Sequence, residues 1–213
     1  MADQRALIFD MDGLMVDSEP MWWRVEKAFA ERRGGVWTDE LAMSCVGKGL
    51  PHLMAVMRDA LGLSLTIDAG VTELVDDFIR RVDELALKPG CREIVDGAVA
   101  RGRRRAVASS SPHRLIRAVL DRFSLTDRFE VVVSGEDVVQ GKPAPDIFLL
   151  TAERLGVTAA DCVVFEDSVA GVTAGRAAGM TVIAVPEHDD PVFAELTPHV
   201  VADLHAARAL VGL

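Results

Sequence analysis

The chain has 213 residues, of which 50% are hydrophobic, and its formal net charge is −10. This length suits one large domain, or one domain that carries a smaller insertion, and the hydrophobic content is enough for a sizeable core. The acidic balance argues against nucleic acid and against an anionic membrane surface as partners.

Five short apolar segments alternate with helical patterns along the chain. Strands separated by helices in this way predict a parallel sheet covered on both faces, which is the doubly wound α/β class. The predicted strands are residues 6–10, 105–109, 130–134, 162–166 and 181–185, and the predicted helices between the later strands are 111–122, 146–156 and 168–179.

The first predicted strand ends in Asp10-Met11-Asp12-Gly13. Residues i and i+2 of a strand point to the same side, and a glycine lets the chain leave the sheet directly after the second carboxylate. Asp10 can then face a substrate while Asp12 turns back toward it. Taken alone, the pattern also suits an ordinary loop, because Asp and Gly are common turn residues.

A long interval without a clear strand pattern follows the first strand. It contains helical patterns at 21–32, 52–61 and 71–87, and Pro89-Gly90 marks the return to the sheet. We predict an α/β core of residues 1–18 and 88–213 with an inserted helical cap of residues 19–87. An insertion at this point would sit above the carboxyl ends of the strands, where ligands bind in open α/β folds.

The second strand ends in three serines, Ser109-Ser110-Ser111, with Pro112 at the expected helix start. Free backbone N–H groups there, together with the Ser109 hydroxyl, would make an anion site. A simple helix cap is the alternative, because serine is a preferred capping residue. His113 lies beside this loop and could contact the same ligand.

The loop after the third strand carries Lys142, which two prolines place in a restricted backbone. Its ammonium group could pair with a phosphate and with a carboxylate. The fourth strand ends in Glu166-Asp167, and either Asp167 or the following serine could simply cap the next helix.

The carboxyl ends of parallel strands share one edge of a sheet, so Glu166 and Asp167 are expected near Asp10 and Asp12. Two carboxylates about 4 Å apart repel by roughly 4 kcal/mol at an effective dielectric constant near 20. Such a cluster requires a hard cation, and ligands that are all oxygen indicate Mg²⁺.

The segments that end these strands resemble the four motifs of the haloacid dehalogenase-like (HAD) hydrolase superfamily. The matching residues are Asp10-Met11-Asp12-Gly13, Ser109, Lys142 and Glu166-Asp167. The resemblance implies a Rossmann-like core and a phosphatase that uses an aspartyl-phosphate intermediate. It implies that Asp10 is the nucleophile and that Asp12 is first the general acid and then the general base.

The same resemblance implies the binding roles at the site. Ser109, the Ser110 amide and Lys142 would bind the phosphoryl group. Magnesium would rest on Asp10, the Asp12 carbonyl and Asp167, with Glu166 in contact with the metal or just behind it. The substrate would be a small phosphorylated molecule, because a small cap leaves little room for a protein-sized substrate.

Within the superfamily, the chain is most similar to sugar-phosphate phosphatases of the 2-deoxyglucose-6-phosphate type, with β-phosphoglucomutases as close relatives. Where the mutases carry a cap histidine and a cap arginine, this chain has Trp22 and Lys48. These departures favour hydrolysis and leave a phosphomutase as the alternative, with Lys48 as a candidate substrate contact. A non-catalytic phosphate-binding module would be expected to lack a motif residue, and none is missing.

Three cysteines, Cys45, Cys91 and Cys162, are scattered with no C-x-x-C spacing. Their odd number and low density are typical of reduced thiols. The first residues have no signal-peptide layout, and no apolar stretch reaches the length of a membrane span. We therefore expect a cytoplasmic monomer that binds neither membrane nor nucleic acid.

Overall fold

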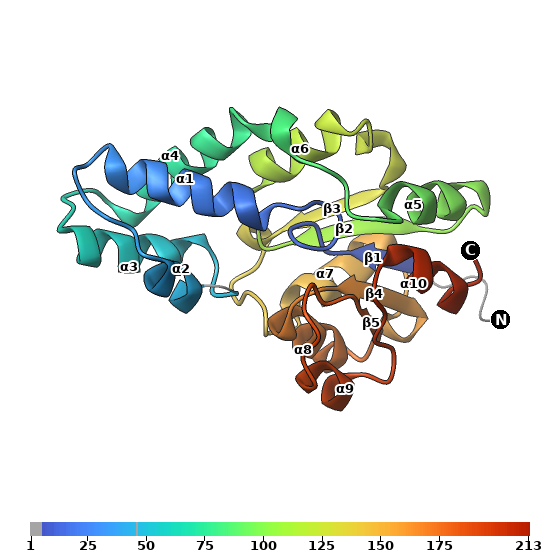
Figure 1. Ribbon diagram of the computed structural model, residues 1–213. Helices are drawn as coiled ribbons and strands as arrows, with labels where there is room; N and C mark the ends of the chain where they lie inside the picture. Colours follow the sequence, from blue (N-terminus) through green and yellow to red (C-terminus); the bar gives the residue numbers. More distant parts are fainter. Residues whose placement is uncertain (1–5, 46) are drawn as a thin grey trace. The chain divides into compact units, whose positions relative to one another are not determined.

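The computed structural model describes residues 6–45 and 47–213. Its larger part is built on a five-stranded parallel sheet in the order β3-β2-β1-β4-β5 (Figure 1). The strands are β1 (Ala6–Phe9), β2 (Arg105–Ser109), β3 (Val131–Ser134), β4 (Cys162–Glu166) and β5 (Thr181–Ala184). The predicted α/β class is confirmed, and each strand lies within one residue of its predicted bounds.

Helices cover both faces of this sheet, which explains why its strands are apolar throughout (Figure 1). Ile8 of β1 and Val164 of β4 belong to one continuous core with Phe148 of α7 and Val172 of α8. One face carries α7 (Asp146–Leu155), α8 (Val169–Ala177) and α9 (Val192–Leu196), and the other carries α5 (Cys91–Ala100), α6 (His113–Arg122) and α10 (Leu204–Leu210).

The strand order has its topological switch point between β1 and β4. From β1 the chain adds β2 and β3 on one side, then crosses to add β4 and β5 on the other. Ligands of open α/β sheets bind outside the carboxyl ends of the strands at such a switch point. Phe9 pairs in register with Phe165 there, and their rings stack with centroids 4.7 Å apart. The next residues, Asp10 and Glu166, therefore leave neighbouring strands side by side.

The chain separates into two compact units, and the smaller one consists of Ser18–Leu85. In its described residues the smaller unit contains helices and no strand. Its role as a cap stays a prediction. Its α-helices are α1 (Glu19–Glu31), α2 (Asp39–Cys45), α3 (Leu50–Leu61) and α4 (Ile67–Ile79).

The predicted helix 71–87 is wrong at both ends. It begins earlier, at Ile67, because the Thr66 side chain caps it by accepting a hydrogen bond from Ala69 N. It ends at Ile79, and farther along Leu87 forms an antiparallel bridge with Val16 in the larger unit. The apolar pattern continues past the helix because Leu87 takes part in this bridge and is half-buried there.

A buried acid lies inside the smaller unit. Glu26 of α1 is 4% exposed, and its Oε2 accepts a hydrogen bond from Trp37 Nε1 at 2.8 Å. Burial raises the pKa of Glu26 from 4.5 to about 7, and the Trp37 bond opposes part of that rise. The folded unit therefore binds a proton at Glu26 more tightly than the unfolded chain does.

This difference predicts that the protein loses stability as the pH rises. A carboxyl with a raised folded pKa stabilises the fold most below pH 4.5, and that contribution is lost between pH 4.5 and about 7. A shift of this size corresponds to roughly 3 kcal/mol at most. Glu26→Gln should abolish this loss, so the unfolding temperatures of the two proteins should diverge between pH 5 and pH 8. Parallel pH profiles would contradict the prediction.

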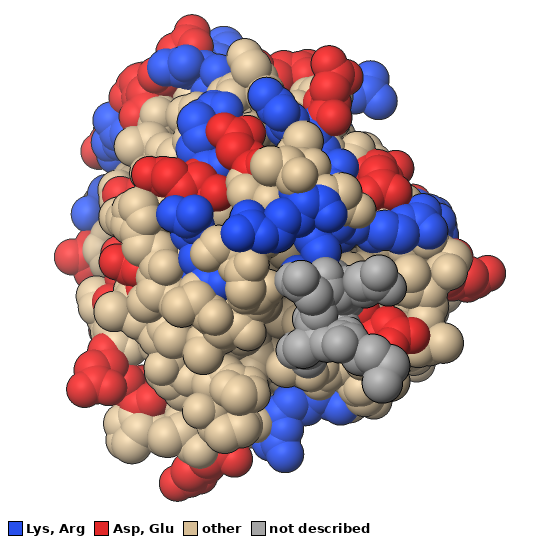
Figure 2. Space-filling model, turned by 90° about the vertical axis from the view of Figure 1, so that its right-hand side faces the viewer, with Lys and Arg blue, Asp and Glu red and all other residues tan. Residues whose placement is uncertain are grey.

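The arginines at the amino end of β2 make contacts within the folded chain. Arg103 is buried and donates to Val211 O at 3.1 Å, while Arg104 pairs with Glu130 at 3.0 Å. Arg104 O in turn accepts from Leu7 N of β1. Figure 2 shows Lys and Arg side chains in a band across one face of the molecule, with acidic side chains on either side.

None of the helices in the described ranges has the length and hydropathy needed to cross a membrane.

Candidate active site

The loop that follows β1 leaves the sheet at Gly13. Asp10 still bonds along the sheet, since its N–H donates to Phe165 O at 3.1 Å, and its side chain is buried. Gly13 has a φ of +80°, a conformation that L side chains rarely adopt. A Cβ at this position would also lie 2.2 Å from Asp167 Oδ2. Glycine is therefore required both by the turn and by the close approach of the Asp167 carboxylate.

Lys142 connects the acids that end β1 and β4. Its Nζ lies 2.5 Å from Asp10 Oδ1 and 2.6 Å from Glu166 Oε1, and it also donates to Ala108 O at 3.2 Å. The side chains of Lys142, Asp10 and Glu166 are only 6%, 9% and 1% exposed. Charge-assisted bonds in such a buried place hold the lysine in one position, unlike a solvated surface lysine.

Both oxygens of the Glu166 carboxylate are engaged. Oε1 faces Lys142, and Oε2 accepts from both the N–H and the hydroxyl of Ser168 at 3.0 Å. Gly171 lies directly against this carboxylate, because a Cβ there would be 1.8 Å from Oε1. Ser168 also caps α8 by accepting from Gly171 N. Capping is thus done by Ser168, and the Asp167 carboxylate is not needed for it.

The electrostatics of the site are those of crowded, buried acids. Burial raises the pKa of Asp10 to about 8; Lys142 opposes this rise, and the charges of Glu166 and Asp12 add to it. Burial, Glu166 and Asp10 also raise the pKa of Asp167. Burial by itself lowers the pKa of Lys142, but the charges of Asp10 and Glu166 outweigh it and raise that pKa. One cation therefore faces several carboxylates.

This cluster fits a divalent metal ion. Asp10, Glu166 and Asp167 each offer a carboxylate oxygen, and these oxygens lie within 4.8 Å of one another. The donors are all oxygen, which hard divalent cations prefer. A bound cation would also supply the positive charge that Lys142 alone does not provide.

The Asp12 carboxylate faces the loop that follows β2. Its Oδ2 accepts from Ser111 Oγ at 2.7 Å and lies 3.4 Å from Ser109 Oγ. Ser109 and Ser111 are buried, whereas Ser110 is exposed. The structure therefore brings Ser109 and Asp12 together, as expected from the strand ends. It also adds Ser111, whose hydroxyl was not singled out from the sequence.

His113 and Lys48 are the two remaining candidate contacts predicted from the sequence. The His113 ring nitrogen Nε2 is 3.0 Å from Asp137 Oδ2, which also accepts from Arg154 Nη1 at 2.9 Å. Although burial raises the pKa of Asp137, hydrogen bonds from His113, the Ser134 backbone and Arg154 outweigh it and lower that pKa to about 2. Lys48 is an exposed residue of the smaller unit, between α2 and α3. Substrate contact by either residue stays a prediction.

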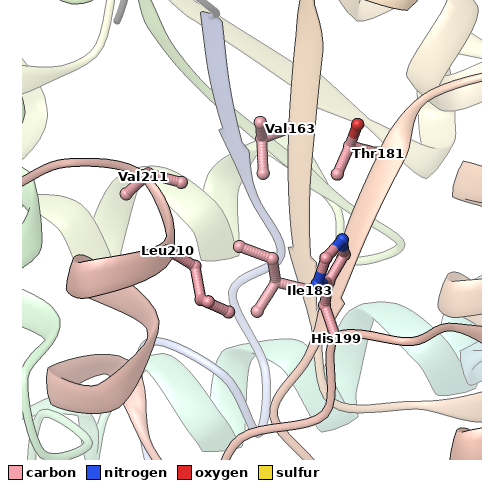
Figure 3. A pocket seen from close by; sticks show the side chains of 6 residues that line it. All are labelled: Val163, Thr181, Ile183, His199, Leu210 and Val211. Atoms are coloured by element: carbon pink, nitrogen blue, oxygen red, sulfur yellow. The ribbon is translucent and has the colours of Figure 1, made fainter. Parts of the chain in front are cut away.

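A separate cavity of about 140 Å³ lies on the sheet face that carries α10 (Figure 3). It contains none of the predicted site residues. Val163, near the amino end of β4, lines the cavity, whereas Glu166 is at the carboxyl end of the same strand. Its lining residues are Val163, Thr181, Ile183, His199, Leu210 and Val211.

A parallel sheet with a buried acid–lysine–acid cluster at its switch point defines an α/β enzyme core. The chain belongs to the haloacid dehalogenase-like hydrolase family, whose model matches residues 4–179. The resemblance identified from the sequence motifs is therefore confirmed at the level of the family.

Relatives that the chain matches over most of their length support this assignment. The chain is 35% identical over 188 residues to a phosphorylated carbohydrates phosphatase of Thermotoga maritima, and the match covers 82% of each protein. It is 34% identical over 208 residues to hexitol phosphatase B of Escherichia coli, covering 88% of this chain and 87% of the relative. A crystal structure from T. maritima, provisionally assigned as a β-phosphoglucomutase, has a TM-score of 0.81 at 30% identity and covers 99% of this chain and 100% of its own.

Proposed function

We propose that this protein is a magnesium-dependent phosphatase that hydrolyses small phosphate monoesters, namely sugar and sugar-alcohol phosphates, through a phosphorylated Asp10. The observation that carries the proposal is the buried cluster in which Lys142 Nζ contacts both Asp10 and Glu166 beside Asp167. The named activities of the relatives supply the substrate class, since both curated proteins are carbohydrate or hexitol phosphatases.

The reaction needs two residues that change covalent or protonation state. The Asp10 carboxylate attacks phosphorus, and a bond from Asp10 to phosphorus forms as the bond to the leaving alcohol breaks. Asp12 gives its proton to the alcohol oxygen. Water then attacks phosphorus while Asp12 takes its proton. The bond to Asp10 breaks, which releases phosphate and restores both side chains.

The remaining residues of the site bind and orient. Ser109 and the Ser110 N–H would hold the phosphoryl oxygens, and Lys142 would balance the charge of Asp10 and the phosphoryl group. Lys48 and His113 are candidate contacts for the rest of the substrate.

Asp10, Asp167 and the Asp12 carbonyl would hold magnesium, which supplies positive charge to the phosphoryl oxygens when bound. We place Glu166 just behind the metal, because Lys142 and Ser168 already occupy its two oxygens. Three free and buried cysteines support a reducing, cytoplasmic setting, and we expect a monomer that acts on small molecules.

The test is phosphate release from p-nitrophenyl phosphate and from a panel of hexose and hexitol phosphates. We expect turnover with magnesium, loss of nearly all activity with EDTA, and recovery when magnesium is returned in excess. Binding of magnesium is measured separately by calorimetry on the metal-free protein. A folded protein that binds magnesium but releases no phosphate from any substrate would contradict the proposal.

A phosphomutase is the second candidate, and the similarity to the T. maritima structure supports it. By the resemblance to mutases noted from the sequence, the chain has Trp22 and Lys48 where the mutases carry a cap histidine and a cap arginine. The same assay decides between the two functions. A mutase primed with a hexose bisphosphate would interconvert glucose 1- and 6-phosphates and release little phosphate, whereas a phosphatase releases phosphate without isomerisation.

A further inference from the structure

The Asp12 carboxylate is held by a serine that none of the proposed roles uses. Ser111 Oγ donates to Asp12 Oδ2 at 2.7 Å, which is a short hydrogen bond. Ser109 Oγ lies 3.4 Å from the same oxygen, at the long end of the hydrogen-bond range. The two hydroxyls thus reach one oxygen of Asp12 with different strengths.

The backbone around Ser111 is anchored by the end of β3. Ser134, which is completely buried, donates its hydroxyl to Ser111 O at 2.6 Å. Gly135 lies so close to Ser110 that a Cβ there would be 2.7 Å from the Ser110 carbonyl oxygen. Ser111 N also donates to Ser109 Oγ at 3.1 Å. Ser111 is 8% exposed, so its hydroxyl is presented from a fixed and largely dry position.

If Ser109 binds the phosphoryl group, which rests on the proposed function, Ser109 and Ser111 have different roles. A Ser109 hydroxyl that turns to a phosphoryl oxygen gives up its weak contact with Asp12. Ser111 keeps the stronger contact. We propose that Ser111 is a positioning residue that orients Asp12 for proton transfer, while Ser109 serves the substrate.

The proposed bond suits both protonation states of Asp12. Ser111 donates to Oδ2, so the proton that Asp12 gives and later takes back is assigned to Oδ1. Oδ2 accepts from Ser111 whether Oδ1 carries a proton or not. The orientation of the carboxyl group is therefore kept through both halves of the reaction.

The test compares substrates that differ in how much they need an acid. The ratio kcat/KM covers the steps up to departure of the alcohol, and p-nitrophenol departs with little protonation. Ser111→Ala should lower kcat/KM for a hexose phosphate by about tenfold, because the hydrogen bond that orients Asp12 is lost. It should change kcat/KM for p-nitrophenyl phosphate by less than about twofold. Ser111→Thr, which keeps a hydroxyl, should restore most of the loss.

Two controls separate this role from a structural one. Ser44→Ala removes the hydroxyl of an exposed residue of α2 that donates to Leu41 O, and it should leave both values unchanged. If Ser111→Ala does not fold, Ser111→Val and Ser111→Thr make the same comparison, since they have nearly the same shape and differ in the hydroxyl.

Equal losses on both substrates, or no loss on the hexose phosphate, would overturn the positioning role of Ser111. Neither of these results contradicts the proposed function, provided that the wild-type protein is active. A folded, magnesium-loaded wild-type protein that is inactive on both substrates would instead overturn the proposed function, and the inference with it.

Discussion

Asp10→Asn is expected to lower phosphate release by at least about 10⁴-fold on every substrate, because loss of a nucleophile removes the whole covalent route. Asparagine has the shape of aspartate, but its amide does not attack phosphorus. Weaker magnesium binding should accompany the loss, since one of the three clustered carboxylates is gone. Stopped assays of phosphate release and calorimetry on the same preparation measure both effects.

The fold should tolerate this change. Asp10 is buried among other carboxylates, so a neutral amide removes the cost of burying its charge and the repulsion from Glu166, which offsets the loss of the ion pair with Lys142. We expect its metal-free unfolding temperature to equal or exceed that of the wild type. Asp161→Asn, at an exposed aspartate that accepts from Thr158 Oγ1, is the matched control and should retain full activity. Activity of Asp10→Asn within tenfold of wild type would remove Asp10 from the nucleophile's role.

The sequence predicted where the chemistry would gather because a parallel sheet imposes a simple rule. Side chains that follow different strands meet when all strands point the same way, however far apart they are in the chain. Asp10 and Glu166 are 156 positions apart in number, yet they follow a pair of stacked phenylalanines on neighbouring strands. Apolar strand patterns and turn residues were therefore sufficient to place the carboxylates at one edge.

The partners of individual side chains could not be predicted in the same way. Three consecutive serines begin at the last residue of β2, and only the turn of the backbone decides that Ser111 reaches Asp12 while Ser110 faces solvent. The pairing of His113 with Asp137 depends on a short 3₁₀ turn after β3 that carries no apolar periodicity. Such contacts depend on distances of a few tenths of an ångström between segments remote in the sequence.

The orientation of the Glu166 side chain is a third detail that only the packing determines. Gly171 leaves room for its carboxylate against the first turn of α8, and Lys142 fixes its other oxygen. In the sequence, Glu166 and Asp167 are two adjacent acids with no sign of which one meets a metal. The structure gives them different surroundings, because Ser168 bonds to Glu166 while the Asp167 carboxylate lies against Gly13.

Asp12→Asn should separate the two halves of the proposed reaction. Asparagine keeps an oxygen that accepts from Ser111 and keeps the backbone carbonyl, so magnesium binding should stay close to that of the wild type. No acid remains for the leaving alcohol and no base for the water, so turnover of a hexose phosphate should fall by about 10²- to 10⁴-fold.

With p-nitrophenyl phosphate, the leaving group needs little protonation, so Asp10 should still be phosphorylated in this variant. Hydrolysis of that phosphate still requires the missing base. A rapid burst of p-nitrophenol, close to one per enzyme, should therefore precede a slow steady state, and acid-quenched protein should carry phosphate by mass spectrometry. Wild-type turnover of a hexose phosphate by Asp12→Asn would defeat the assignment, whereas a burst that Asp10→Asn lacks would tie the covalent step to Asp10 and the proton transfers to Asp12.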